Sequence, residues 1–432
     1  MVALIKTLQV ILALSLLIFI HELGHFAWAR LFKIRVEKFY LFFDIGGKAI
    51  CRFRRGETEF GIGWLPLGGY CKIAGMIDES MDLEQMKNEP QPWEFRSHPA
   101  WQRLFVMAGG VLNNFIFAIL AFILIMDIWG DAQLGVKGNR IYAGELAYEM
   151  GFRTGDEILM FDDYEPTDFY MMQADLARRN VHYATVLRGT DTLQLYIDHA
   201  MIGDVVNTPV LFDLALPFVI DTTQAGSPNT AFHRGDRVIS INGREFDYVQ
   251  DSRPILAELK GTTAEARLVR GTDTLAIPVQ VDTAGRIGVI LQMPDVIRRE
   301  YSFIEAIPAG WKMTWKTVGG YVRDLKLLAQ PSTGAYKSVG SFIAIGQIFP
   351  AAWDWYQFLN ILALLSIMLA VMNLLPIPAL DGGHIVFTLY ELLTGRKPSD
   401  RFMEVMQIIG LLLIMALMLL AFGNDISRFI LK

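Results

Sequence analysis

Four long apolar segments dominate the pattern of this chain of 432 residues. They cover residues 2–20, 104–129, 358–375 and 408–422. Each approaches or reaches the roughly twenty residues that an α-helix needs to cross the hydrocarbon core of a bilayer. The pattern therefore predicts a polytopic α-helical membrane protein with four spanning helices.

Residues 48–73, which follow the first apolar segment, are rich in β-branched and aromatic side chains interrupted by glycine and proline. This composition predicts short strands, which we interpret as a membrane-associated β-hairpin region. Its apolar tip, residues 60–65, either dips into the bilayer or forms a surface hairpin with an apolar turn. The polar residues 78–99 predict a loop or a short helix at the membrane surface.

The segment between the second and third apolar runs contains two weakly similar units. A Gly-Asp step precedes an apolar strand pattern at Gly155-Asp156 and again at Gly235-Asp236. An internal repeat explains this similarity, and each unit resembles a PDZ domain, an α/β fold that commonly holds an extended peptide against a sheet edge. The alternative is a pair of spacers, or a steric shield, that binds no peptide.

Residues 301–328 place tryptophan and tyrosine among lysine and arginine at helical spacing. We interpret them as an interfacial helix, and the alternative is a helix packed on the repeats. Five parts are then predicted: 1–130 with the first two spanning helices and the β-rich loop, 131–211 and 212–296 as PDZ-like domains, 297–357 as the interfacial segment, and 358–432 with the last two spanning helices.

Composition agrees with a membrane protein that carries an extramembrane insert. Hydrophobic residues make up 53% of the chain and charged residues 19%, too apolar a balance for an ordinary soluble enzyme. The net charge of −6 comes with no basic run interleaved with aromatic residues, so no nucleic-acid partner is expected. Cys51 and Cys71 are the only cysteines in the sequence, and we expect two reduced thiols.

Basic residues predict the orientation, because lysine and arginine concentrate in cytoplasmic loops. The loops after the first and third apolar segments carry them: Arg30, Lys33, Arg35, Lys38, Lys48, Arg52, Arg54, Arg55, Lys72, Lys87 and Arg96, then Arg396, Lys397 and Arg401. We therefore expect these loops in the cytoplasm, and both termini and the repeats on the opposite side.

Candidate chemistry lies inside an almost unbroken apolar stretch over residues 1–32, where His21, Glu22 and His25 form an HExxH pattern. Histidines four residues apart share one face of a helix and can offer ring nitrogens to a single Zn²⁺. Glu22 projects nearby, placed to take a proton from a water on the metal. Ionisable side chains are costly at membrane depth, so their presence there indicates function.

A catalytic zinc needs a third protein ligand. Asp381 is the predicted donor, because it follows the third apolar segment directly after Pro376 and Pro378, which must break or kink that helix. Unwound backbone at membrane depth is tolerated where it lines a cavity, which suits an active site. His384 is the rival ligand, and we favour for it a hydrogen-bonded role on the helix instead.

These motifs resemble the site-2 protease family of intramembrane zinc metalloproteases, in its bacterial RseP type. The resemblance rests on residues 21–25, 66–70, 110–115 and 373–384, on the repeats and on the end of the chain at 423–428. It implies zinc held by His21, His25 and Asp381, with Glu22 as catalytic base. It also implies substrate contacts by the last set of residues: Asn373, Pro376, Pro378 and Asn114.

The same resemblance implies regulated intramembrane proteolysis in a bacterial inner membrane, with the active site toward the cytoplasmic leaflet. The expected partners are the lipid bilayer, single-span substrates such as anti-sigma factors and signal-peptide remnants, and an upstream site-1-type protease that trims those substrates. The chain departs from this type at residues 339–342, where Val-Gly-Ser-Phe replaces a usual Gly-Pro step.

Two other classes of protein fit parts of the pattern. A metal transporter would use buried histidine and aspartate as a transit site, and a proteolytically silent PDZ scaffold would use the repeats to recruit partners. Neither needs a base beside a histidine pair, so Glu22 discriminates against both. A purely structural zinc would call for four protein ligands, and the sequence offers three good candidates.

Overall fold

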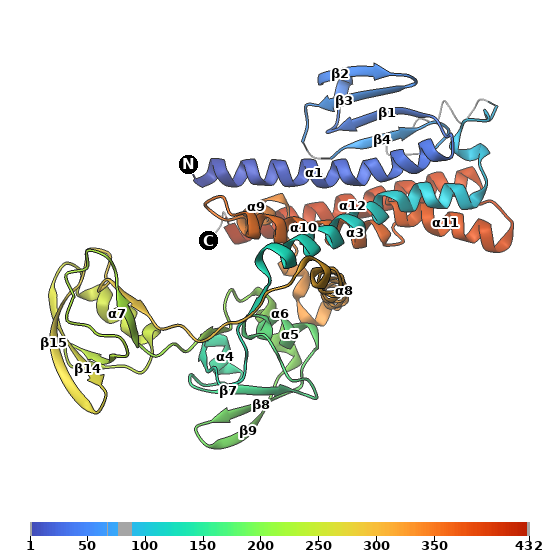
Figure 1. The fold of residues 1–432 in the computed structure, drawn as a ribbon. Coiled ribbons are helices and arrows are strands. Elements are labelled where there is room, and N and C mark those ends of the chain that lie inside the picture. Colours follow the sequence, from blue (N-terminus) through green and yellow to red (C-terminus); the bar gives the residue numbers. More distant parts are fainter. Residues whose placement is uncertain (1, 67, 77–88, 430–432) are drawn as a thin grey trace. The chain divides into compact units, whose positions relative to one another are not determined.

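The computed structural model describes residues 2–66, 68–76 and 89–429 of the chain (Figure 1). It divides into two compact units, each described separately here. Unit 1 comprises Met1–Asp131, Glu300–Leu325 and Lys337–Lys432, and unit 2 comprises Ala132–Arg299 and Lys326–Tyr336. Leu67 and most of the predicted surface loop, residues 78–88, lie outside the described residues. The rest of that loop includes a short 3₁₀ helix, η2 (Phe95–Ser97).

Four helices of the described chain are long and apolar enough to cross a membrane, which agrees with the predicted polytopic membrane protein. They all belong to unit 1, and α3 packs against both α1 and α10 (Figure 1). The four are α1 (Val2–Leu31), α3 (Ala100–Trp129), α10 (Trp355–Leu374) and α12 (Asp400–Phe429).

Glycines bring α1 and α3 into close contact. A Cβ atom added to Gly24 would collide with the backbone of Gly109, and one added to Gly109 would lie 2.6 Å from the carbonyl oxygen of Gly24. Small residues at a crossing let helix backbones approach closely, a common device in membranes. The crossing lies one turn or less from His21 and His25, so it fixes the height of α3 beside both rings.

A four-stranded sheet lies beside α1 in the order β2-β3-β1-β4 (Figure 1). The strands are β1 (Val36–Leu41), β2 (Ala49–Arg55), β3 (Thr58–Gly63) and β4 (Tyr70–Ile73), with η1 (Ile45–Gly47) before β2. Strands β2 and β3 form a hairpin, but β1 pairs with β3 in parallel. Phe39 of β1 packs edge-on against Phe19 and Phe26 of α1. This contact places the terminal strand β4 next to the helix that carries the histidines.

The helix break predicted at Pro376 and Pro378 is confirmed. Helix α10 ends at Leu374, and α11 (Asp381–Thr394) begins after six residues of non-helical backbone. Ala379 adopts a positive φ of 73°, a conformation uncommon for residues with a side chain. Its backbone N–H donates to Oε1 of Gln407 on α12 at 3.2 Å. The break therefore ends in a defined turn that presents Asp381 at the start of α11.

Two further helices, α8 and α9, lie between α3 and α10 in the sequence. The predicted interfacial segment forms α8 (Phe303–Leu328), which packs on α3: Trp315 stacks on Phe115, and Gly310 fits against Ile123. Helix α9 (Phe342–Ile348) follows the 3₁₀ turns η5 (Pro331–Thr333) and η6 (Ala335–Ser338). Where the sequence departs from the RseP type, Ser341 Oγ donates to the buried carboxylate of Asp425 at 2.5 Å. That hydrogen bond ties the start of α9 to the end of α12.

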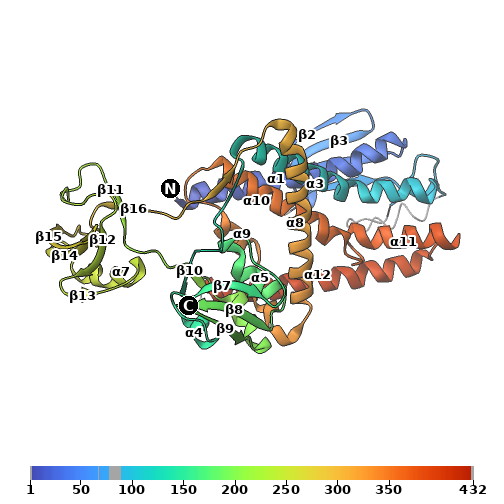
Figure 2. The same ribbon diagram turned by 60° about the horizontal axis from the view of Figure 1, so that its bottom comes forward.

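Unit 2 contains two hydrophobic cores that correspond to the two sequence repeats. Side chains of helix α7 and of the sheet β13-β12-β14-β15 form most of the second core. Figure 2 shows this sheet and helix side by side. Elements around the first core are β6 (Ile141–Ala143), α4 (Glu145–Glu149), β7 (Glu157–Phe161), η3 (Phe169–Met171), α5 (Met172–Arg178), β8 (Tyr183–Arg188), β9 (Asp191–Tyr196), η4 (His199–Met201), α6 (Ile202–Asn207) and β10 (Phe212–Leu214). Those around the second are β11 (Ile220–Thr223), β12 (Arg237–Ile241), β13 (Arg244–Glu245), α7 (Val249–Glu258), β14 (Thr263–Arg270), β15 (Asp273–Gln280) and β16 (Val289–Leu291), and β5 (Asp131–Gln133) pairs with β17 (Ile297–Arg299).

The ends of the repeats differ slightly from the predicted boundaries. Strand β10, which the sequence division assigned to the second domain, pairs with β6 of the first. Residues 326–336, assigned to the interfacial segment, belong to unit 2, and Leu327 and Ala335 pack in the first core. Strand pairing and apolar contacts thus extend the first repeat at both places.

The two repeats share one buried ion pair at the same place in each. Asp156 accepts hydrogen bonds from the guanidinium of Arg188 at 2.7 and 2.8 Å, and Asp236 accepts two from Arg270, both at 2.7 Å. Each aspartate also accepts a backbone N–H at 2.8 Å, from the residue three positions before it. The Gly-Asp step that marks the repeat in the sequence therefore carries a duplicated structural anchor.

Candidate metal centre and substrate cavity

His21 and His25 lie on one face of α1, as their spacing predicts. Both are buried, with 8% and 6% of their surface exposed. Their Nε2 atoms are 3.3 Å apart, and the rings meet edge to face with centroids 4.9 Å apart. Two ring nitrogens therefore point to one place from consecutive turns of the same helix.

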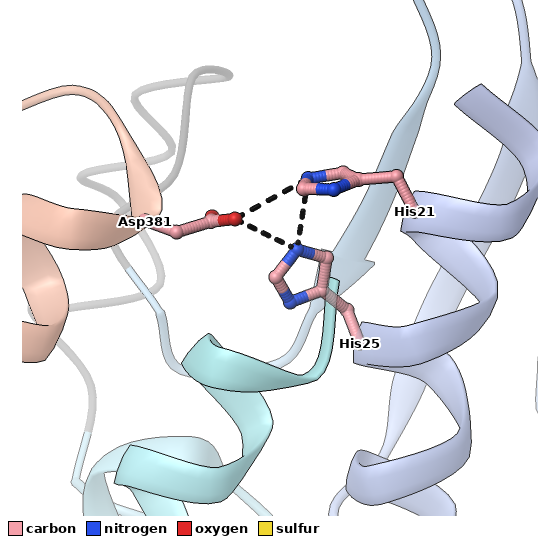
Figure 3. Close-up of side chains that lie close together, drawn as sticks. All are labelled: His21, His25 and Asp381. Carbon is pink, nitrogen blue, oxygen red and sulfur yellow. Dashed lines mark hydrogen bonds and ion pairs between the residues drawn. The ribbon is translucent and has the colours of Figure 1, made fainter. Parts of the chain in front are cut away.

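Asp381 joins this pair from the first position of α11 (Figure 3). Its Oδ2 atom lies 3.3 Å from Nε2 of His21 and 3.3 Å from Nε2 of His25. That oxygen is buried and accepts no hydrogen bond. A buried carboxylate oxygen without a donor is costly and calls for a cation or another explanation.

The three ligand atoms fit a tetrahedral zinc. With bonds of about 2.0–2.1 Å and tetrahedral angles, ligand atoms stand about 3.3–3.4 Å from one another. The sides of the His21, His25 and Asp381 triangle are 3.3 Å each. Among the described residues, this trio is the group of histidine, cysteine and acidic side chains that can converge on one ion. His384, the rival ligand, is not part of it.

Helix α3 shapes the back of the site through Val106, which the sequence analysis did not single out, and through Gly110 of the 110–115 motif. The backbone carbonyl of Val106 lies 2.8 Å from Nδ1 of His25, so Nδ1–H donates to it and Nε2 keeps its lone pair for a metal. Gly110 lies against both rings, and a Cβ atom there would collide with His25 and His21. The glycine run at 109–110 was visible in the sequence, but its distance from the histidines was not.

Glu22 faces the same cavity as the trio. It is half-buried, and its carboxylate lies within hydrogen-bonding reach of the backbone of Cys71 on β4. The sheet therefore contacts the candidate base directly.

An open cavity of about 910 Å³ surrounds the trio. Strand β4 forms one wall through residues 70–73, and α1, α10 and α11 form the others. The walls near α1 and α10 are apolar, with Leu14, Leu17, Ile18, Leu365, Met368 and Leu369. The cavity is far larger than a water or an ion needs, and β4 forms part of its wall.

The other predicted site residues lie in different places. Asn373 lines the cavity, with Nδ2 3.4 Å from Nε2 of His21. Pro376 and Pro378 form the break between α10 and α11. Asn114 is fully buried behind His21, with Nδ2 3.1 Å from Nδ1 of that ring, and it does not line the cavity.

A polar network on the sheet, also missed from the sequence, holds β4 in place. Asp44 accepts hydrogen bonds from Tyr70 Oη at 2.8 Å and from Lys38 Nζ at 3.1 Å. Burial alone would raise the pKa of the Asp44 carboxyl, but these two bonds outweigh it and hold the pKa below its usual range. The ionised carboxylate thus connects β4 to β1 beside the cavity.

Comparison with known proteins agrees with this geometry. Residues 9–417 match the model of Peptidase family M50. The chain belongs to that family. A relative in Neisseria meningitidis with "zinc metalloprotease" in its name is 29% identical over 98% of each chain. The family and the name of this relative identify the chain as a zinc metalloprotease.

Relatives of the RseP type cover the M50 chain almost end to end. The regulator of sigma-E protease RseP of Salmonella typhimurium is 30% identical over 97% of each chain. The Escherichia coli protein of the same name is 29% identical over 97% of each chain. The resemblance read from the motifs is therefore confirmed.

Proposed function

We propose that this protein is a site-2 protease that performs regulated intramembrane proteolysis, hydrolysing peptide bonds within or near the spanning segment of single-span substrates. One observation carries the proposal: two histidines and an aspartate converge inside an apolar helix bundle, at the edge of a cavity large enough for a peptide. Ligands buried among spanning helices are of use to a protease whose substrate also lies in the membrane.

His21, His25 and Asp381 would hold the zinc in this proposal, and all three line the cavity. When bound, Zn²⁺ supplies a Lewis acid that polarises a carbonyl and lowers the pKa of a water. Glu22, which faces the cavity, would accept a proton from the attacking water and return it to the leaving amine. The backbone of Cys71 keeps the Glu22 carboxylate directed at the cavity.

A substrate helix must unwind before it can be cut, because its carbonyls are hydrogen-bonded within the helix. We infer that the extended segment lies along β4, whose main chain compensates the lost helix bonds. Asn373 lines the opposite side of this path, and Pro376 and Pro378 form the helix break that follows it. The amide of Asn373 is the group best placed to bind an exposed peptide carbonyl.

The substrates and partners are proposed from the relatives. The Salmonella and Escherichia coli proteins are both named as regulators of sigma-E. We propose anti-sigma factors and signal-peptide remnants as substrates of this chain, first trimmed by an upstream site-1-type protease. The lipid bilayer is the common environment of enzyme and substrate.

We also propose that the chain resides in a bacterial inner membrane. The basic loops face the cytoplasm, the termini and unit 2 face the periplasm, and the active site lies toward the cytoplasmic leaflet. Residues 131–211 and 212–296 are proposed as PDZ-like domains that exclude substrates with bulky extramembrane parts. The segment 297–357 provides the interfacial helix, supported by the exposed Trp311 and Trp315 of α8.

The decisive experiment compares the wild type with Glu22→Gln in detergent. Both proteins are purified, loaded with zinc and incubated with a panel of single-span substrates, and cleavage is followed by mass spectrometry. We expect Glu22→Gln to bind zinc normally and to lose cleavage by orders of magnitude. Equal cleavage by both proteins would refute Glu22 as the base. No cleavage by either, together with zinc transport into liposomes by both, would favour the transporter.

A further inference from the structure

Asn114 is a fully buried polar side chain with one end unsatisfied. Its amide nitrogen Nδ2 lies 3.1 Å from Nδ1 of His21, and its Oδ1 atom has no hydrogen-bond partner among the described residues. The residue has 0% of its surface exposed and does not line the cavity. A substrate in the cavity would therefore not touch it.

Zinc binding by His21 decides how this amide must lie. A neutral imidazole carries its proton on one ring nitrogen, so a lone pair on Nε2 for the metal requires the proton on Nδ1. Nδ1–H would then point at the N–H₂ end of Asn114, placing two donors against each other. A half-turn of the carboxamide, whose two ends have nearly the same shape, removes this conflict.

We propose that Asn114 is a positioning residue for the metal centre, with Oδ1 accepting the hydrogen bond from Nδ1–H of His21. This inference rests on the ligand set of the proposed function. It gives the unsatisfied oxygen a donor and fixes both the ring orientation and the tautomer of His21. Partners behind the metal ligands play this part in many zinc sites.

The second histidine shows the same arrangement with a main-chain partner. Nδ1 of His25 lies 2.8 Å from the carbonyl oxygen of Val106, on the same helix as Asn114. Helix α3 thus offers one oxygen to each ring, two turns apart. The backbone at Asn114 is itself held, because Ser366 Oγ of α10 donates to its carbonyl at 2.9 Å.

The test measures zinc affinity, which does not depend on turnover. Wild type, Asn114→Leu, Asn114→Asp and Asn113→Leu are stripped of metal and titrated with zinc against a chromophoric chelator. Asn113 is the matched control, since its amide donates to the carbonyl of Ile20 at 3.2 Å rather than to a histidine. An ionised aspartate can only accept, so Asn114→Asp keeps the required acceptor.

We expect Asn114→Leu to lose about 10- to 100-fold in zinc affinity. Asn114→Asp should stay close to the wild type, as should Asn113→Leu. Cobalt substitution adds a second readout: the visible spectrum of the leucine variant should change, whereas that of the aspartate variant should keep its tetrahedral form. Thermal unfolding of the metal-free proteins separates loss of fold from loss of metal, and the aspartate variant is informative even if the leucine variant is unstable.

Two results would overturn the inference. Zinc affinity that is unchanged in Asn114→Leu, with a raised KM for cleavage, would assign Asn114 to substrate binding. Equal loss of zinc in the aspartate and leucine variants would show that a hydrogen-bond acceptor is not what matters. Asp381→Asn, measured in parallel, tests the ligand set itself: unchanged affinity there would refute the proposed function, and not only this refinement.

Discussion

Aspartates with buried carboxylate oxygens have different partners in the two units. In unit 2, Asp156 and Asp236 are 0% and 1% exposed, and each is matched by an arginine and a backbone N–H. In unit 1, Oδ2 of Asp381 is buried beside two imidazoles and accepts no hydrogen bond. Burying a carboxylate is tolerated when donors or a cation compensate it.

This difference distinguishes a structural ion pair from a candidate metal site. A carboxylate whose donors are all in the chain holds loops and strands together and needs nothing more. A carboxylate that converges with histidine ring nitrogens, and that no arginine or lysine of the described residues binds, is a candidate metal ligand. The groups around the carboxylate, and not its depth of burial, distinguish the proposed metal site from the ion pair that the two repeats share.

Replacing Asp381 by asparagine should have the largest effect. The amide is a poor zinc ligand, so we expect stoichiometric zinc to be lost and kcat to fall on the order of 10³-fold or more. Metal content and single-turnover cleavage measure this. Hydrogen exchange in unit 2 should not change, and a general loss of protection there would contradict a role confined to the metal.

Gly110→Ala should have the next largest effect, because its Cβ would displace both histidine rings. A shift of about 1 Å in a catalytic group can cost about 10²-fold in rate. Gly423→Ala on α12 is the control, since no atom lies near its Cβ position. Activity equal to wild type in Gly110→Ala would show that α3 does not press on the rings.

Asp236→Asn tests the anchor and should leave the metal site intact. Arg270 and the N–H of His233 would lose their charged acceptor, and we expect about 1–3 kcal/mol less local stability. Hydrogen exchange of β12 and β14 in the full-length protein measures this loss, with the exposed Asp273→Asn as control. Zinc content should stay at the wild-type level, and a drop would break the distinction between anchor and site.

The smallest effect is expected from pH. The hydrogen bond from Arg270 holds the pKa of the Asp236 carboxyl below its usual range. A lowered pKa in the folded state means that the pair stabilises the domain above the unfolded value of about 3.9 and stops doing so as pH falls through the folded value. The difference in exchange between wild type and Asp236→Asn should therefore persist at neutral pH and vanish in strong acid.

Much of the candidate site could be predicted because its residues follow helical spacing and helix-breaking chemistry. His21 and His25 share a face at any i, i+4 spacing, and the prolines at 376 and 378 require a break before Asp381. Contacts between residues that are far apart in the sequence left no pattern from which they could be predicted. The acceptor behind His25 is a carbonyl of Val106, and every residue has a carbonyl.

The fold shows the same division between local and distant information. The strands between residues 48 and 73 were predicted from composition, but the parallel pairing of β1 with β3 joins residues about twenty positions apart and leaves no local pattern. Strand β10 joins the first repeat for the same reason, because its partner β6 is far away in the chain. The network of Asp44 depends on that sheet and could not be foreseen without it.

The glycine crossing of α1 and α3 has a consequence for the membrane around it. Bilayers differ in thickness, and a spanning helix adapts by tilting or by distorting the lipid. Gly24 and Gly109 leave no side chain between the two backbones at the crossing. The two helices must therefore respond to a thinner or thicker bilayer together, and His21 and His25 keep their places beside α3 as they do so.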